Sequence, residues 1–408
     1  MLPAILVGLV LATVANERQH VLGPLDATVR VESDALVVLA VAEGVSGLNV
    51  GDRIVGIGTT PFDPDYAPSV EGLVSAGPLV EFGDALRHAW GLTGRLELLL
   101  ATDTGRRSAE VAVGFAPTFG DSFPEQSAWA DAAAVRLADW LIQEQRADGL
   151  WSGDASPLSG LALLATGRAV DRAAALRAAR EIGKTNRSDA ATILIAEASL
   201  ATHNSALLRG ITPRPAHRIA ELPSDMLGLA LLARGVLRDV GVEGAEHGLW
   251  SLRSHLDERT RDDGYLSGSL PHDLGPTALA MLGVAATSSP DSLVADHGYL
   301  NRGATYLAEH AHALMHGAMF SAAFLSTART DPAALRRLAD THRWWFSLAI
   351  APDGGAHAQP HPAGLPTTDA PRVRATAELL LALMAPRQKL RILGQPLPEL
   401  GRQPATER

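Results

Sequence analysis

Residues 50–58 read Val-Gly-Asp-Arg-Ile-Val-Gly-Ile-Gly, and this stretch decides how the N-terminal region is interpreted. Gly51 can supply the positive φ of a tight turn, and Asp52 can hydrogen-bond to the backbone of its own turn. The β-branched, apolar residues that follow, Ile54-Val55 and Ile57, are typical of a strand. We therefore expect a tight turn that leads into a buried strand.

The segments on either side of this stretch extend the pattern into a small domain. They are a strand at Ala35–Val41, a Gly-rich turn at 43–48, a helix at Glu81–Trp90, and two strands at Arg95–Ala101 and Ser108–Val113. Asp103-Thr104-Gly105 is a hairpin-type turn between the last two strands. In this order the elements resemble the PDZ domains of bacterial secreted proteins, so we expect a PDZ-like β domain over residues 35–116.

The resemblance implies a binding site for a protein or peptide partner. Such domains bind the C-terminus of a peptide by strand addition at an exposed sheet edge. That edge would be the strand that carries Leu36, Val37, Val38 and Leu39. The preceding stretch has no glycine and brings two acids, Glu32 and Asp34, which would repel a carboxylate. Peptide binding and a purely structural or docking role therefore both stay open.

The composition of the chain excludes several chemistries. The 408 residues include no cysteine, which rules out disulfides, thiolate catalysis and cysteine-ligated zinc. With 35 basic and 45 acidic residues the net charge is -10, which argues against a nucleic-acid partner. No cofactor is predicted.

The two ends of the chain differ from the rest. Leu2–Ala15 is continuously apolar, ends in small residues, and is shorter than the roughly 20 residues that span a bilayer. We interpret it as a signal peptide, with a buried strand as the alternative, and expect a secreted or periplasmic protein without a membrane span in the mature chain. The predicted segments are a signal peptide at 1–15, a lead-in at 16–34, the PDZ-like domain at 35–116, an all-α domain at 126–393 and a disordered tail at 394–408.

Alanine-rich helical periods begin after Pro117. Ala134, Leu137, Ala138 and Leu141 fall on one face of a helix. The other expected helices are 156–167, 171–182, 188–202, 225–240, 276–287, 301–316, 335–348 and 375–384. The predicted fold class is therefore α+β multidomain, with a small PDZ-like β domain followed by an all-α domain of stacked helical hairpins.

Gly-containing corners punctuate the helices roughly every 50 residues, the range of helical repeats. They are Asp148-Gly149-Leu150-Trp151, His247-Gly248-Leu249-Trp250, His297-Gly298-Tyr299-Leu300 and Asp353-Gly354-Gly355, with Asp263-Gly264-Tyr265 outside this register. The first corner, preceded by Gln143 and Gln145, resembles the corners of triterpene cyclases and protein prenyltransferases. That resemblance implies an α/α toroid, complete or incomplete, and indicates fold rather than reaction.

Residues 22–393 as a whole resemble an uncharacterised family of secreted bacterial proteins that join a PDZ-like domain to such a toroid. Besides the stretch at 50–58, the resemblance rests on Leu22-Gly23-Pro24, residues 159–167, Trp344-Trp345-Phe346 with Pro352–Gly355, and Pro386-Arg387-x-x-Leu390-Arg391-Ile392. It implies an architecture and supplies no chemistry.

Candidate catalytic residues lie in two loops rich in Asp, Gly and His. Asp262, Asp263 and His272 share one loop, and Asp353, His357 and His361 share the other. Paired carboxylates of this kind serve as acid and base in glycoside hydrolases, and Trp344-Trp345 could line a sugar-binding mouth. The alternative, that Asp and Gly only cap helices, is favoured.

His312 and His316 are weak candidates for a metal site. They are spaced i, i+4 on an expected helix, which suits two metal ligands. The intervening residues, Ala313-Leu314-Met315, lack the glutamate of a metalloprotease helix.

Two functions remain after these exclusions. One is a secreted protein- or ligand-binding scaffold without catalysis. The other is a toroid enzyme, a hydrolase or lyase, that acts on a saccharide or related polymer. The scaffold predicts inner helices filled by Leu and Ala, whereas the enzyme predicts a cavity that gathers the acids and histidines named above.

Overall fold

The structure is a computed structural model in which the chain divides into two compact units. It describes residues 19–45, 47–63, 77–89, 94–113, 119, 123–152, 154–185, 188–213, 222–266, 274–288, 290–311, 320–357, 372–387 and 389–393. The β unit is Met1–Ser122 with Ser127–Trp129 and Asp340–Ala375, and the helical unit is Phe123–Gln126 with Ala130–Ala339 and Thr376–Arg408. In the described segments, no helix has the length and apolarity needed to cross a membrane.

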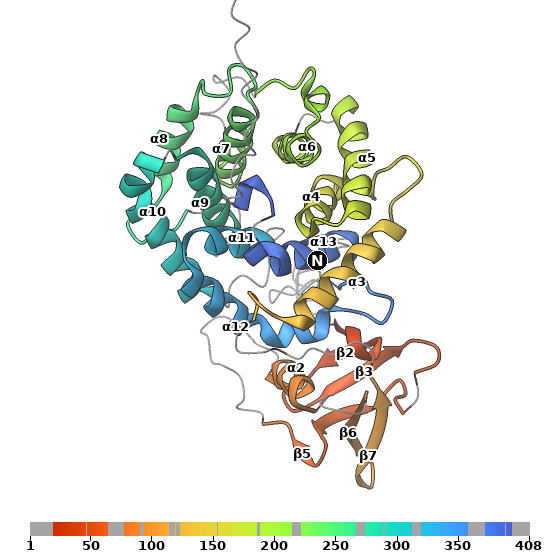
Figure 1. The fold of residues 1–408 in the computed structure, drawn as a ribbon. Coiled ribbons are helices and arrows are strands. Elements are labelled where there is room, and N and C mark those ends of the chain that lie inside the picture. The colour runs from red at the N-terminus through yellow and green to blue at the C-terminus, as the bar shows by residue number, and fades with distance from the viewer. Residues whose placement is uncertain are drawn as a thin grey trace, which may run out of the picture. The chain divides into compact units, whose positions relative to one another are not determined.

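An antiparallel seven-stranded sheet forms the centre of the β unit (Figure 1). Its strands are β1 (Gln19–Leu22), β2 (Ala27–Val31), β3 (Leu36–Val41), β4 (Arg53–Ile57), β5 (Thr60–Pro61), β6 (Arg95–Thr102) and β7 (Gly105–Ala112). The order is β1-β2-β3-β4-β6-β7, with β5 paired to β4. Along β6, the buried Leu96, Leu98 and Leu100 alternate with more exposed residues, as expected for a sheet with one face on a core.

Several local predictions for this sheet are confirmed. Gly51 has a φ of 91°, and the β6–β7 hairpin turns through Asp103 and Thr104. The helix α2 (Gly77–Ala89) buries Phe82 completely. The sheet nevertheless begins at Gln19, ahead of the expected start at 35, because the predicted lead-in contains β1 and β2. Both strands are short and interrupted by polar residues, so their apolar period was too weak to stand out.

The second half of α12 (Pro332–Ala349) belongs to the β unit, although the sequence placed it in the helical domain. Two glycines allow its backbone to come close. A Cβ on Gly83 of α2 would lie 2.5 Å from the Trp344 carbonyl oxygen, and one on Gly23 would lie 2.5 Å from that of Leu348. A larger residue at either position would therefore force this helix away.

The helical unit confirms the α+β multidomain fold class. The other helices that contribute to it are α3 (Ala128–Gln143), α4 (Ser156–Thr166), α5 (Ala169–Thr185), α6 (Asp189–Thr202), α7 (Ser224–Asp239), α8 (Leu249–Arg259), α9 (Gly275–Thr287), α10 (Pro290–Glu309), α11 (Phe320–Thr330) and α13 (Arg372–Met384). Ser188 caps α6 by accepting a hydrogen bond from the Ala191 N–H. Gly167 ends α4 with a φ of 73°, at the predicted end of that helix.

These helices form two rows (Figure 1). In the inner row, α4, α6, α7, α9 and α11 pack in succession, each against the next. In the outer row, α5 packs on α4 and α6, α8 on α7 and α9, and α10 on α9 and α11. The inner α9 is buried from Gly275 to Ala286, whereas the outer α8 buries only Leu252 and Leu256. Apolar residues all round a helix are the mark of an inner position, and one buried stripe is the mark of an outer one.

The closest helix crossing in the inner row uses glycines. A Cβ on Gly228 of α7 would lie 2.4 Å from the backbone nitrogen of Ala280 in α9. A Cβ on Gly283 of α9 would lie 2.7 Å from the carbonyl oxygen of Gly228. The two backbones therefore touch at this crossing.

The segment that follows α13 is tied to the first helix of the helical unit. Arg387, in the short helix η5 (Ala385–Arg387) after α13, donates a hydrogen bond to Asp131 of α3 at 2.5 Å. It also donates to the backbone carbonyl of Glu125 at 2.5 Å. Helix α3 and the segment that follows α13 are therefore held together.

Candidate functional site

Asp262 and Asp263 lie in an exposed turn between α8 and α9. The Asp263 Oδ1 atom accepts a hydrogen bond from the Tyr265 backbone N–H at 3.0 Å, and its Oδ2 atom pairs with Arg261 at 3.0 Å. Gly264 has a φ of 90°, which an L side chain rarely adopts. The Asp263 carboxylate is therefore engaged in holding this turn.

Asp353 occupies a matching turn in the β unit. Its Oδ1 atom accepts a hydrogen bond from the Gly355 N–H at 3.0 Å, and Gly354 has a φ of 97°. The Arg372 guanidinium makes two further hydrogen bonds to the carboxylate, at 2.7 and 2.9 Å. This carboxylate too is satisfied by its own turn and by one arginine.

A third turn of the same kind contains Asp148. The Leu150 N–H donates to its Oδ1 atom at 3.0 Å, and Gly149 has a φ of 82°. In all three turns the first residue donates its N–H to the carbonyl four residues on and accepts from the glycine N–H, each at 2.9 Å. The three corners are Arg146–Trp151, Arg261–Leu266 and Ala351–Ala356. We refer to them as the Asp-Gly corners.

Two of the predicted corners are different structures. His297-Gly298-Tyr299-Leu300 lies within α10, and Gly248 stands at the N-cap of α8 with a φ of 83°. Asp263-Gly264-Tyr265, outside the expected register, is a full member of the set. The spacing rule failed because unequal lengths of chain separate the true corners, whereas the Asp-Gly pair identifies each one.

The first corner braces neighbouring helices. Trp151 is 1% exposed and its Nε1–H donates to the carbonyl of Leu141 in α3 at 2.7 Å. The Gln145 amide donates both to the Gly149 carbonyl at 2.7 Å and to the Ala174 carbonyl of α5 at 2.9 Å. The aromatic and amide groups of this motif thus connect three elements.

A small cavity in the β unit contains the other residues that the sequence singled out. Its lining is His20, Val21, Leu79, Trp344, Trp345, Leu348, Ala349 and His357. Its volume of about 10 Å³ is near the smallest that holds one water molecule. Trp344 and Trp345 are 7% and 5% exposed. Both indoles are therefore core residues, and neither lines an open sugar-binding mouth.

His357 lines this cavity and has a shifted pKa. Burial lowers the pKa of His357, and the nearby Arg372 lowers it further, against the weaker influence of Asp26 and Asp353. Its Nε2 atom is buried and makes no hydrogen bond to the described part of the chain. Asp353 and His357 belong to the β unit and Asp262 and Asp263 to the helical unit, so neither unit contains the full candidate set.

Other predicted positions fall outside the described residues. They are the metal candidates His312 and His316, the loop residues His272 and His361, the signal segment 1–15 and the tail 394–408. Among the residues that are described, no group of three or more His, Asp or Glu side chains is arranged to hold a metal ion.

The strand predicted to receive a peptide lies inside the sheet. β2 pairs along one side of β3, and β4 pairs with Leu36 and Val37 on the other. Val38 also exchanges hydrogen bonds with Gly51 and Asp52, each at 2.8 Å. β3 is therefore an interior strand rather than the expected edge. Leu39 lies past this second ladder, and the question of whether peptide binds there stays a prediction.

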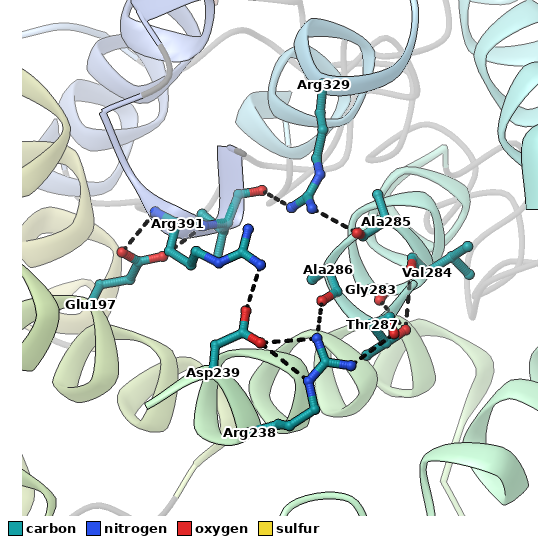
Figure 2. Close-up of polar contacts among 11 residues, drawn as sticks. Glu197, Arg238, Asp239, Gly283, Val284, Ala285, Ala286, Thr287, Arg329 and Arg391 are labelled. Carbon is teal, nitrogen blue, oxygen red and sulfur yellow. Dashed lines mark hydrogen bonds and ion pairs between the residues drawn. The ribbon is translucent and has the colours of Figure 1, made fainter. Parts of the chain in front are cut away.

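Sequence reasoning missed a buried polar cluster in the helical unit (Figure 2). Glu197 of α6 accepts hydrogen bonds from the backbone N–H groups of Arg391 and Ile392, at 3.0 and 2.8 Å. Arg391 in turn pairs with Asp239 at 2.8 Å. Arg391 and Ile392 belong to the segment Lys389–Leu393, which we call the C-terminal strap. The available signal was a single glutamate in the otherwise apolar run Ile193–Ala198 of an inner helix.

Arginines complete this cluster by capping α9. Arg238 donates to the carbonyls of Ala286 and Thr287, at 3.0 and 2.8 Å. Arg329 donates to the carbonyl of Ala285 at 2.6 Å. Figure 2 shows both guanidinium groups directed at the end of this helix. Cations are favoured there because the last carbonyls of a helix have no partner within it.

No family model matches this chain, and no curated protein or solved structure is significantly similar to it.

Proposed function

We propose that the protein is a secreted binding scaffold without catalytic activity, with a PDZ-like module in the β unit and an α/α toroid in the helical unit. The observation that carries this proposal is the engagement of Asp263 and Asp353 in turns of identical geometry. A catalytic acid or base must be free to exchange a proton with substrate. The carboxylates of Asp263 and Asp353 stabilise positive-φ turns and pair with arginine, so their role is structural.

The interior of the helical unit supports the same conclusion. The inner helices α4 and α9 consist mainly of Leu, Ala and Gly residues, and most of their positions are buried. Toroid enzymes need an open cavity lined by polar groups, because a substrate must reach the reacting side chains. Close packing of the inner row favours a scaffold.

The order and packing of the elements support a PDZ-like module and an α/α toroid. The sheet, the turn at Gly51 and the helix α2 follow the order expected of a PDZ-like domain. The two rows of helices, the brace at Trp151 and the tie from Arg387 to Asp131 are features expected of a closed α/α ring. The apolar segment Leu2–Ala15 supports secretion to the periplasm or beyond.

We propose a protein or an extended peptide as the partner. The second ladder of β3 ends at Val38, and no other described strand pairs with that side of Leu39. Strand addition needs such unpaired backbone, and alternate side chains then give specificity.

A binding screen with the full chain tests this function. Fluorescent peptides of random sequence and a panel of oligosaccharides are offered, and dissociation constants are measured by anisotropy. We expect a saturable peptide ligand whose affinity falls at least about tenfold in Leu39→Arg, the loss of roughly 1.4 kcal/mol. The control is Val135→Arg on the exposed face of α3, which should bind as the parent does. Cleavage of any oligosaccharide, or equal loss in both variants, refutes the proposal.

A further inference from the structure

Helix α5 has a basic outward face. Its buried residues lie on one side of the helix, which packs on α4 and α6. At about 100° per residue, the opposite side carries Val170, Arg177, Arg180 and Lys184, and all four are exposed. The charged members of this set are all basic, and of these Lys184 pairs with the flanking Glu181 at 2.7 Å. We call these four residues the α5 face.

Helix α8 has an acidic outward face. It packs on α7 and α9 and buries only Leu252 and Leu256. The opposite side of the helix includes Trp250, Asp257 and Glu258. Trp250 is 82% exposed, and the side chains of Asp257 and Glu258 are 53% and 65% exposed. We call these three residues the α8 face.

The two carboxylates of the α8 face have only weak partners within the helical unit. Asp257 pairs with Arg253 at 3.4 Å, but the Arg253 guanidinium makes a shorter contact with Asp296, at 2.6 Å. Glu258 contacts His255 at 3.3 Å, and that imidazole is charged only when it is protonated. Exposed pairs of this kind contribute little free energy. The α8 face therefore keeps negative charge that a partner can use.

The exposed indole of Trp250 indicates what kind of partner fits this face. Tryptophan is enriched among the residues whose removal costs an interface most of its binding energy. The face of an indole also attracts the cations of Lys and Arg side chains. Asp257 and Glu258 would repel the anionic surface of a membrane, whereas they would attract the same cations. The chemistry of this face therefore calls for a basic protein surface.

The α5 face has this chemistry, and it belongs to the same unit. Figure 1 shows α5 and α8 on opposite sides of the helical unit, so the two faces of one molecule do not meet. We propose that the α5 face of one copy docks on the α8 face of a second copy. The basic side chains then pair with Asp257 and Glu258, and the Trp250 indole is covered.

This contact joins copies head to tail. The two faces are different, so each bound copy still offers one free face of each kind at the ends of the assembly, and the contact extends into a chain or a ring. Both faces lie in the helical unit, so the proposal does not depend on whether the β unit binds a peptide.

Sedimentation velocity of the full chain tests the proposal. We expect the mean mass of the parent to rise with concentration past that of a dimer. The association should weaken at least about tenfold between about 0.05 and 0.5 M salt, because exposed charges are screened.

Two variants each remove one face and leave the other intact. Arg180→Glu reverses a charge on the α5 face, and Trp250→Ala removes the indole of the α8 face. Each variant alone should associate at least about tenfold more weakly than the parent. In an equal mixture, the intact α8 face of Arg180→Glu meets the intact α5 face of Trp250→Ala. The mixture should therefore form a dimer that grows no further.

The matched controls are Arg336→Glu on α12 and Val50→Ala in the β unit. Both residues are exposed and lie outside the two faces, so these variants should associate as the parent does.

Several results would overturn the proposal. A parent that stays monomeric up to near-millimolar concentration would show that a second copy is not the occupant. Unchanged association in Arg180→Glu would show that copies meet through another surface. A mixture of the two variants that associates no better than either alone would contradict the head-to-tail contact. Equal weakening in Arg336→Glu would reduce the effect to overall charge.

Discussion

The crossing of α7 and α9 can be tested by adding one methyl group. In Gly228→Ala the new Cβ would lie 2.4 Å from the backbone nitrogen of Ala280 and 2.5 Å from the carbonyl carbon of Leu279. Both are backbone atoms, so no side chain can rotate away to make room. The two helices must separate, and the packing of the inner row must change with them.

The expected magnitude comes from two opposing contributions. Replacing glycine by alanine inside a helix ordinarily stabilises it by about 1 kcal/mol. Overfilling a packed interior costs about 1–3 kcal/mol, and the figure here should fall at the upper end because backbone atoms are in the way. We therefore expect Gly228→Ala to lower the free energy of unfolding by about 1–2 kcal/mol.

A second glycine provides the matched control. Gly183 lies in α5, and its added Cβ would find nothing closer than the Ile195 Cδ1 atom at 3.7 Å. Gly183→Ala should therefore stabilise the unit by about 0.5–1 kcal/mol. Urea unfolding followed by far-ultraviolet circular dichroism measures both variants. If Gly228→Ala is as stable as Gly183→Ala, the close approach of α7 and α9 is wrong.

Three further predictions concern the corners and the cavity. Trp151→Phe keeps an aromatic ring but leaves the buried Leu141 carbonyl without its donor, which should cost about 1–3 kcal/mol in urea unfolding. An unchanged midpoint would contradict the brace. Asp353→Ala should be about 1 kcal/mol less stable than Asp353→Asn, because asparagine still accepts the Gly355 N–H, and equal midpoints would refute this. The pKa of His357 lies below its ordinary 6.5 in the folded state, so on acidification the unfolded chain takes up the proton before the folded chain does. The free energy of unfolding should therefore fall as the pH drops below 6.5. His357→Gln should flatten this fall when the free energy of unfolding is measured from about pH 7.5 to 5.

Elements with a strong local signal were predictable from the sequence. Gly167 was the predicted end of the helix that begins at 156, and the structure has it at the C-cap with a φ of 73°. The turn at Gly51 followed in the same way from its backbone requirement. Such signals depend on only a few neighbouring residues, so they can be recognised in a sequence whose tertiary structure is unknown.

Placement in space was harder to predict. Trp344 follows a helical pattern like those of the preceding domain and His357 lies in the loop after that helix, yet both belong to the β unit. What brings them there is the close approach permitted by Gly23 and Gly83, which lie far away in the sequence. Glu197 likewise finds its partners in Arg391 and Ile392 at the other end of the chain. Contacts between residues so far apart in the chain produce no periodic pattern in the sequence, so the sequence did not predict them.

Recurrence separates the structural role of the Asp-Gly corners from a catalytic one. An active site needs its acid and base once, whereas a fold built from helical hairpins needs a brace at each of several connections. Asp148, Asp263 and Asp353 each accept a hydrogen bond from the N–H two residues on, and each precedes a glycine with positive φ. Three equal geometries in one chain therefore argue for a repeated building element. Any chemistry of this protein should be sought away from these corners, at positions that occur only once, such as Glu197 under the C-terminal strap.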